Sequence, residues 1–143
     1  MSSIFHLAFP VHDFDQASHF YCDLLGCQKG RQSKHAMILA LGGHQLVAHR
    51  VDGINTSKDS IYPRHFGLIF EEKKSFDDFV ERLEQASVPF EVPLKVRFEN
   101  TPLEHHSFFL KDPSNNLLEF KYYSNPDAIF GETDYHRIGE TKP

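Results

Sequence analysis

Two histidines stand at matching points of two apolar, strand-like segments of the sequence, FHLAF and RHFGLIF. His6 and His65 are each followed two residues later by a small residue, Ala8 or Gly67, which in a strand lies on the same face. A carboxylate, Glu119, lies in a third such segment, NLLEFKYY. Two imidazoles and one carboxylate that meet in a cavity make a site for Fe(II), Mn(II), Ni(II), Co(II) or Zn(II), with positions left open for substrate. We therefore predict that these three side chains bind one divalent metal ion.

The elements that carry these residues follow one order twice, which indicates an internal repeat. Each repeat is predicted to be a strand, an amphipathic helix and three further strands. In the first repeat the helix begins after an Asp13 N-cap and ends at Gly26, and in the second it begins after a Ser75 N-cap. If the first strands of the repeats meet, each repeat contributes half of a curved sheet and the two histidines face one another.

The chain is predicted to be a single domain, residues 1–143. Its parts are repeat 1 at about 4–51, a linker at 52–63, repeat 2 at about 64–123 and a tail at 124–143 to which we assign no structure.

Further candidates lie on the same strand faces as the predicted ligands. In the last strand Glu119 shares its face with Tyr123, and in the fourth strand Gln45 shares its face with His49. We expect Gln45 and Glu119 to occupy equivalent positions in the two repeats. The predicted catalytic residues are His49, His106 or its neighbour His105, and Tyr123, which with Phe109 is also a candidate to line a pocket for a flat ligand.

The composition excludes several classes of partner. Fifteen basic and twenty acidic residues give a formal charge of −5, and the basic residues form no run that could neutralise a row of phosphates, so we expect no nucleic-acid partner. No apolar run approaches the roughly 18 residues that cross a membrane, and no signal peptide precedes the first strand, so we expect a cytoplasmic protein. Cys22 and Cys27 are too few for a disulfide framework and are expected to be free, buried thiols.

Three segments resemble the vicinal oxygen chelate superfamily, which includes glyoxalase I, extradiol dioxygenases, fosfomycin-resistance enzymes and bleomycin-binding proteins. They are FHLAFPVHDFDQASHFYCDLLG, RHFGLIF and FFLKDPSNNLLEFKYY, and the D-P-x-x-N turn before LLEF is the most specific signature. The resemblance covers about residues 4–123. It implies an α+β fold in which two βαβββ modules form a curved, incompletely closed mixed-sheet barrel around a central cavity. It also implies that the metal ligands are His6, His65 and Glu119.

Within the superfamily, the segments GGHQLVAH and PRHFG are similar to a bacterial group of predicted extradiol-type dioxygenases. This resemblance implies that Fe(II) is the ion and that it binds two adjacent oxygens of a small, catechol-like substrate and then O2. One residue departs from the pattern. Ring-cleaving members typically carry a tyrosine ten residues before the final glutamate, where this chain has Phe109, which cannot donate a hydrogen bond.

Two alternatives stay open beside the dioxygenase. A glyoxalase I-like lyase or isomerase would use Gln45 as a fourth ligand and Glu119 as a base that leaves the metal. A bleomycin-resistance-like protein would bind a small ligand without metal, although it has no need of the three retained ligand types. By the same resemblance we expect a homodimer.

Overall fold

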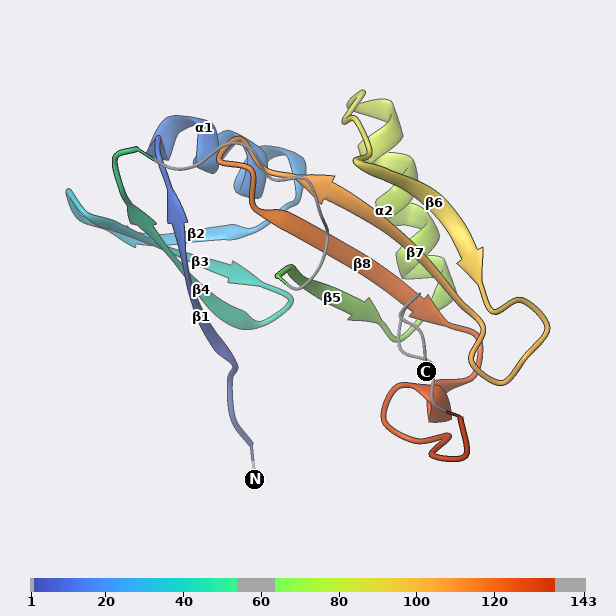
Figure 1. Cartoon of the computed structure of the whole chain (residues 1–143). Coiled ribbons are helices and arrows are strands. Elements are labelled where there is room, and N and C mark those ends of the chain that lie inside the picture. The colour runs from blue at the N-terminus through green and yellow to red at the C-terminus, as the bar shows by residue number, and fades with distance from the viewer. Residues whose placement is uncertain (1, 54–63, 136–143) are drawn as a thin grey trace. The chain divides into compact units, whose positions relative to one another are not determined.

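The computed structural model describes residues 2–53 and 64–135, which form two compact units. The first unit contains residues 2–53, 64–65 and 111–117, and the second contains residues 66–110 and 118–135. Among these residues, each unit holds one four-stranded mixed sheet and its own helical segment (Figure 1). The α+β class and the twofold βαβββ order are therefore confirmed. The predicted enclosure of one cavity by both sheets concerns the placement of the units and stays a prediction.

The sheet of the first unit has the strand order β1-β4-β3-β2, with β1 parallel to β4 and the other pairs antiparallel. The strands are β1 (His6–Val11), β2 (Gln28–Gln32), β3 (Ala36–Leu41) and β4 (His44–Arg50). One sheet face packs on a helical segment, α1 (Phe14–Ser18) continued by the π-helix η1 (His19–Leu24). Phe9 of β1, for example, lies 5.3 Å from Tyr21 of η1, measured between ring centroids. Among the described residues of this unit, no helix lies on the opposite sheet face.

The sheet of the second unit has the strand order β5-β8-β7-β6, with β5 parallel to β8. The strands are β5 (Phe66–Phe70), β6 (Val92–Arg97), β7 (His105–Lys111) and β8 (Leu117–Tyr123). The helix α2 (Lys73–Gln85) covers one face of this sheet, as Figure 1 shows. The core between α2 and this sheet is aromatic. The ring centroid of Phe79 lies 4.9 Å from that of Phe120, and the ring centroid of Phe76 lies 5.8 Å from that of Phe108. A short 3-10 helix, η2 (Pro126–Ala128), follows β8.

The two helices begin for different reasons. The Asp13 N-cap is confirmed, because its carboxylate accepts a hydrogen bond of 2.8 Å from the backbone N–H of Gln16. The Ser75 N-cap is wrong, because α2 begins three residues earlier, after Glu72. Lys73 donates to Asp77 at 2.8 Å, and this i,i+4 pair stabilises the additional turn.

The DPSNN turn between β7 and β8 belongs to the first unit. The buried carboxylate of Asp112 accepts a hydrogen bond of 2.8 Å from the hydroxyl of Tyr21, which is fully buried. The same carboxylate accepts from the backbone N–H groups of Ser114 and Asn116 at 2.8 and 2.7 Å. Burial raises the pKa of Asp112, while these donors partly oppose the increase. The turn motif therefore has a structural role: it ties the end of the second repeat to the helix of the first.

Several smaller predictions can also be compared with the structure. Both cysteines are free, but only Cys27 is buried, and burial raises the pKa of its thiol to about 12. Most of the predicted linker and the end of the predicted tail, residues 54–63 and 136–143, lie outside the described residues. No helix in the described ranges is long and apolar enough to cross a membrane.

Candidate functional site

The first candidate ligand, His6, opens β1 on the sheet face that no helix of its unit covers. Its backbone pairs with that of Gln45 on β4, and the two side chains are hydrogen-bonded. The distance from His6 Nδ1 to Gln45 Oε1 is 2.8 Å. Since an amide oxygen can only accept, Nδ1 carries the proton and Nε2 holds the lone pair. This is the tautomer that an imidazole needs in order to bind a metal ion through Nε2.

The other two candidate ligands belong to the second repeat. His65 is half-buried and lies one residue before β5, so the prediction that it lies within the strand is wrong by one residue. Glu119 lies in β8, also half-buried, and its backbone pairs with that of Gly67.

The expected equivalence of Gln45 and Glu119 is wrong. Gln45 pairs with His6 itself, whereas Glu119 pairs with the residue two positions after His65. Glu119 therefore corresponds to Val47, which pairs with Ala8, the residue two positions after His6.

Gly67 is required by the close approach of β5 to β8. A Cβ atom built on Gly67 would overlap the carbonyl oxygen of Glu119 and lie 2.7 Å from its carbonyl carbon. Real Cβ atoms essentially never come within 3.0 Å of another heavy atom in this way. The small residue two positions after the histidine, noted in the sequence, thus allows the strand carrying Glu119 to lie against β5.

The predicted metal ligands come from both units, so their convergence stays a prediction. Within each unit, the described residues include no cluster of three or more His, Cys, Asp or Glu side chains that could hold an ion. The donor set itself fits a divalent metal, because it combines a correctly oriented imidazole, a second imidazole and a carboxylate.

The adjacent histidines of β7 lie on opposite faces of their sheet. The ring of His106 lies 6.4 Å from Phe76 of α2 and 6.0 Å from Tyr122, on the helix-covered face. His105 lies on the other face, 4.8 Å from the ring of Tyr123. Glu119 shares that face, because it lies four residues before Tyr123 in the same strand. The structure therefore places His105, and not His106, on the sheet face that carries Glu119, and there His105 packs against Tyr123.

The imidazole of His105 is neutral near pH 7. It is 2% exposed, and burial lowers its pKa, although a hydrogen bond of 2.9 Å with the carbonyl of Leu103 acts in the opposite direction. That carbonyl can only accept, so Nδ1 donates and Nε2 is the unprotonated nitrogen.

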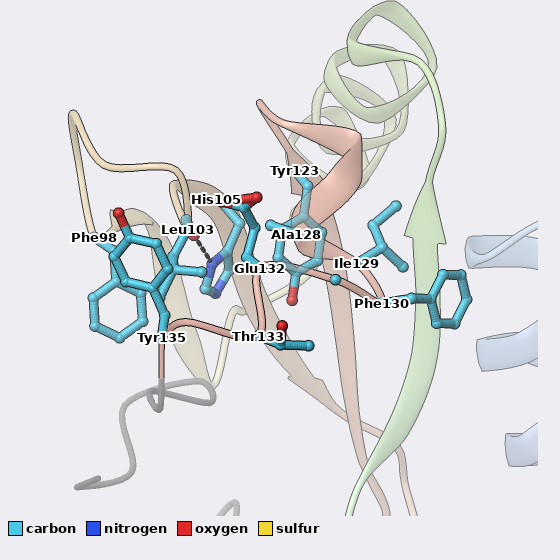
Figure 2. Close-up of a pocket in the computed structure, with 11 residues that line it drawn as sticks. Phe98, Leu103, His105, Tyr123, Ala128, Ile129, Phe130, Glu132, Thr133 and Tyr135 are labelled. Atoms are coloured by element: carbon cyan, nitrogen blue, oxygen red, sulfur yellow. Dashed lines mark hydrogen bonds between the residues drawn. The ribbon is translucent and has the colours of Figure 1, made fainter.

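Tyr123 and His105 line a cavity of about 420 Å³ at the end of the second unit (Figure 2). The chain after β8 forms the opposite wall with residues that the sequence did not single out, Glu132, Thr133 and Tyr135 among them. The ammonium of Lys121 lies 4.9 Å from the ring centroid of Tyr123. No periodic pattern in the tail indicated a wall of this kind.

Phe109 lies opposite Glu119 in the β7–β8 pair. At one end of this pair the backbone N–H of Asp112 donates a hydrogen bond to the carbonyl of Asn116, and at the other the N–H of Ser124 donates to the carbonyl of Glu104. Both hydrogen bonds give the same antiparallel register, in which residue 109 pairs with residue 119. Phe109 is buried, 1% exposed, and does not line the cavity. At the position where ring-cleaving members typically carry the tyrosine hydroxyl, this chain therefore has the apolar ring of Phe109 beside Glu119.

His49 shares the helix-free face of the first sheet with His6 but lies far along it. Its backbone pairs with Pro10, four residues after His6 in β1. At about 3.3 Å per residue this separation is roughly 13 Å along the strand. Direct contact between His49 and a ligand bound at His6 would require a large substrate.

A family model described as the Glyoxalase/Bleomycin resistance protein/Dioxygenase superfamily matches residues 3–120. The chain belongs to this superfamily. The resemblance to the vicinal oxygen chelate proteins is thereby confirmed, whereas the extradiol-type subgroup is not. Superfamily members commonly bind divalent metal ions and small-molecule substrates, and they often form dimers.

Among solved structures, the superfamily member "glyoxalase/bleomycin resistance protein/dioxygenase" from Alicyclobacillus acidocaldarius is 44% identical to this chain, with a TM-score of 0.85. The match covers 90% of this chain and 96% of that one. The fosfomycin resistance protein FosX from Listeria monocytogenes is 16% identical, with a TM-score of 0.69 over 90% of this chain and 98% of that one. Lactoylglutathione lyase from Agrobacterium tumefaciens is 21% identical, with a TM-score of 0.63 over 85% and 94%. At such low identity the last two support the fold alone. No curated protein matches the chain.

Proposed function

We propose that this superfamily member is a metal-dependent enzyme that acts on a small substrate with two adjacent oxygen atoms, and that it is an Fe(II) dioxygenase for catechol-like molecules. The observation that carries the proposal is the hydrogen bond between His6 and Gln45. It holds the imidazole in the tautomer that presents Nε2 to an ion, and a histidine with a purely structural role has no need of this orientation.

His65 and Glu119 would complete the ligand set, as the superfamily resemblance implies. A divalent ion held by these side chains would bind the two substrate oxygens and, with O2, supply the chemistry of ring cleavage. The protein would contribute orientation of the substrate and a base for its hydroxyl proton. His49, His106 and Tyr123 stay predicted catalytic residues.

The second candidate function is a glyoxalase I-like isomerisation, and one observation favours it. The amide oxygen of Gln45 lies 2.8 Å from the His6 ring, close enough for Gln45 to turn from that ring to the same ion as a fourth ligand. Glu119 would then be the base that moves a proton between two carbon atoms of the substrate. Phe109 opposite Glu119 also fits this reaction better than ring cleavage, because isomerisation does not require the missing hydroxyl.

The decisive measurement is the metal content of the purified protein after anaerobic reconstitution with Fe(II). We expect one ion per chain, with at least tenfold weaker binding in His6→Ala, His65→Ala and Glu119→Gln. His35→Ala is the matched control, since His35 is an exposed histidine in a turn. Absence of bound ion in the wild type would overturn both enzyme proposals and leave the metal-free ligand-binding protein.

Two assays on the loaded protein separate the enzyme candidates. Oxygen uptake with a panel of catechols tests the dioxygenase, and isomerisation of a methylglyoxal–thiol hemithioacetal tests the glyoxalase. The proposal includes a homodimer in the cytoplasm, and light scattering of the purified chain tests the dimer.

A further inference from the structure

The helix-free face of the first sheet carries three rows of side chains across β1, β4 and β3, which lie side by side in Figure 1. Paired residues of neighbouring strands lie on the same face, and alternate pairs along the strands form successive rows. From the His6 end, the rows are His6, Gln45 and Ala40, then Ala8, Val47 and Ile38, and last Pro10, His49 and Ala36. A substrate bound to an ion at His6 can therefore extend along this face over the other two rows.

The middle row is a floor for an apolar body. Its side chains are aliphatic, and Ala8 is exposed while Val47 and Ile38 are half-buried. Neighbouring rows are two residues apart, which is roughly 7 Å along the strands. A single ring that lies on this row would therefore turn one edge toward the His6 row and the opposite edge toward the His49 row.

The third row ends the face with groups that favour an anion. His49 is exposed, and an imidazole donates a hydrogen bond to a carboxylate in either of its charge states. Lys34, also exposed, lies in the turn between β2 and β3, two residues before Ala36, the partner of His49. The hydroxyl oxygen of Ser33 accepts hydrogen bonds of 3.2 Å from the backbone N–H groups of His35 and Ala36, so the turn that carries Lys34 has a defined conformation.

The charge of the whole sheet acts in the same direction. None of its four strands contains an acidic residue, although the chain has a formal charge of −5. Asp52, which follows β4, lies 3.4 Å from Arg50, and Arg50 pairs with buried Val11 on the helix-covered face. The helix-free face of this sheet therefore attracts negative charge, unlike the chain as a whole.

The separation of the first and third rows sets the length of the ligand. His6 and His49 are four residues apart in the register of β1 and β4, roughly 13 Å along the strands. An ion takes up about 2 Å for each bond to His6 and to a substrate oxygen, and a hydrogen bond to His49 takes up about 3 Å. These bonds differ in direction from the strand, so roughly 6–9 Å remain between the substrate oxygens and the group that His49 binds. Catechol is too short to reach His49, whereas a catechol with a short side chain spans this distance.

We propose that the substrate carries an anionic group at the end opposite its two adjacent oxygens, and that His49 and Lys34 bind this group. The substrate class is a catechol-like ring with a carboxylate on a short side chain, because the middle row accepts a flat apolar body and the third row requires negative charge. This inference rests on the proposed function, since an ion at His6 fixes the other end of the substrate. It assigns His49 to substrate binding.

The test uses the full chain loaded with Fe(II) under anaerobic conditions, so that binding is measured without turnover. The probes are 3-(3,4-dihydroxyphenyl)propionate and its amide, which has the same shape and no charge. Isothermal titration calorimetry gives the affinity of each. We expect the acid to bind about tenfold more tightly than the amide, the size of effect that a charged hydrogen bond produces at an exposed site. The preference should decrease in high salt, because salt screens exposed charges.

Variants locate the anionic end of the probe. His49→Ala and Lys34→Ala should each reduce the preference for the acid about threefold, and the double variant should bind acid and amide alike. Both positions are exposed, and neither residue is a predicted metal ligand, so the Fe(II) content should stay that of the wild type. Lys29→Ala is the matched control. It removes one positive charge from the same sheet, but Lys29 pairs with buried Leu39 on the helix-covered face, so the preference should be unchanged.

The outcomes separate this inference from the proposed function. A loaded wild type that binds acid and amide equally overturns the inference and leaves the metal enzyme standing. So does a double variant that is folded, by circular dichroism, and keeps the full preference for the acid. A chain that takes up no Fe(II), or a loaded chain that binds neither probe, overturns the inference together with the proposed dioxygenase.

Discussion

Replacement of Gly67 by alanine tests whether the close approach of β5 and β8 determines where Glu119 lies. The added methyl group would overlap the carbonyl oxygen of Glu119. A flexible side chain could turn away from such an overlap, but a backbone carbonyl in a sheet cannot move without moving its strand. The central parallel pair of the second sheet must therefore separate by a substantial fraction of an ångström or more.

The expected cost lies at the upper end of that for overfilled interiors, about 3 kcal/mol, because backbone rather than side chain must shift. Each kcal/mol lowers the melting temperature by about 2–8 °C in domains of this size range, so Gly67→Ala should melt at least about 6 °C below the wild type. Gly43→Ala is the matched control. Its φ of +82° strains any side chain, but nothing lies within 4 Å of the new Cβ, so we expect a loss of only about 1 kcal/mol.

Urea unfolding followed by circular dichroism gives both free energies of unfolding, and calorimetry gives the melting temperatures. Equal losses in the two variants would show that the close approach of Gly67 to Glu119 costs no more than the backbone strain at Gly43. A Gly67→Ala protein that melts within about 2 °C of the wild type would refute the steric argument altogether.

Three further predictions concern single hydrogen bonds and one titration. Tyr21→Phe removes a donor to the buried Asp112 carboxylate and should lower the free energy of unfolding by about 1.5–3 kcal/mol in urea titrations, and a change below about 0.5 kcal/mol would contradict it. Gln45→Ala removes the acceptor that orients His6 and should weaken Fe(II) binding about 10- to 100-fold by metal titration, whereas unchanged affinity would mean that the ring needs no such support. The pKa of His105 is lowered in the folded state, so the unfolded state takes up its proton first and stability falls as the pH drops below about 6.5. In urea titrations from pH 7.5 to 5, His105→Phe should lose less stability on acidification than the wild type, and parallel curves would contradict the assignment.

Local sequence patterns were sufficient to predict the elements. The short segments AMILAL and HQLVAHRV predicted β3 and β4, and Asp13 predicted the start of α1 through its own side chain, because these signals act over a few residues. The start of α2 was predicted three residues late, since the Ser75 signal was outweighed by the Lys73–Asp77 pair, which forms only once the earlier turn is helical.

Strand pairing was less accessible from the sequence. Nothing local shows that β1 pairs with β4 so that His6 meets Gln45, or that β5 pairs with β8 so that Glu119 meets Gly67. The sequence also left open which of His105 and His106 shares the sheet face of Glu119, for the same reason. Parity along a strand says that adjacent residues point to opposite faces, but only packing against Phe76 of α2 decides which face is which.

The sequence by itself determined the repeated βαβββ order, the superfamily and the residue types that could bind a divalent ion, because each of these depends on short-range pattern or on chemical identity. Tertiary structure alone decided the tautomer of His6 and the burial of His105 within an aromatic cavity. It also decided the structural role of the DPSNN turn beneath Tyr21. These features arise where side chains distant in the chain come within a few ångströms, and that proximity is a property of packing that no local pattern encodes.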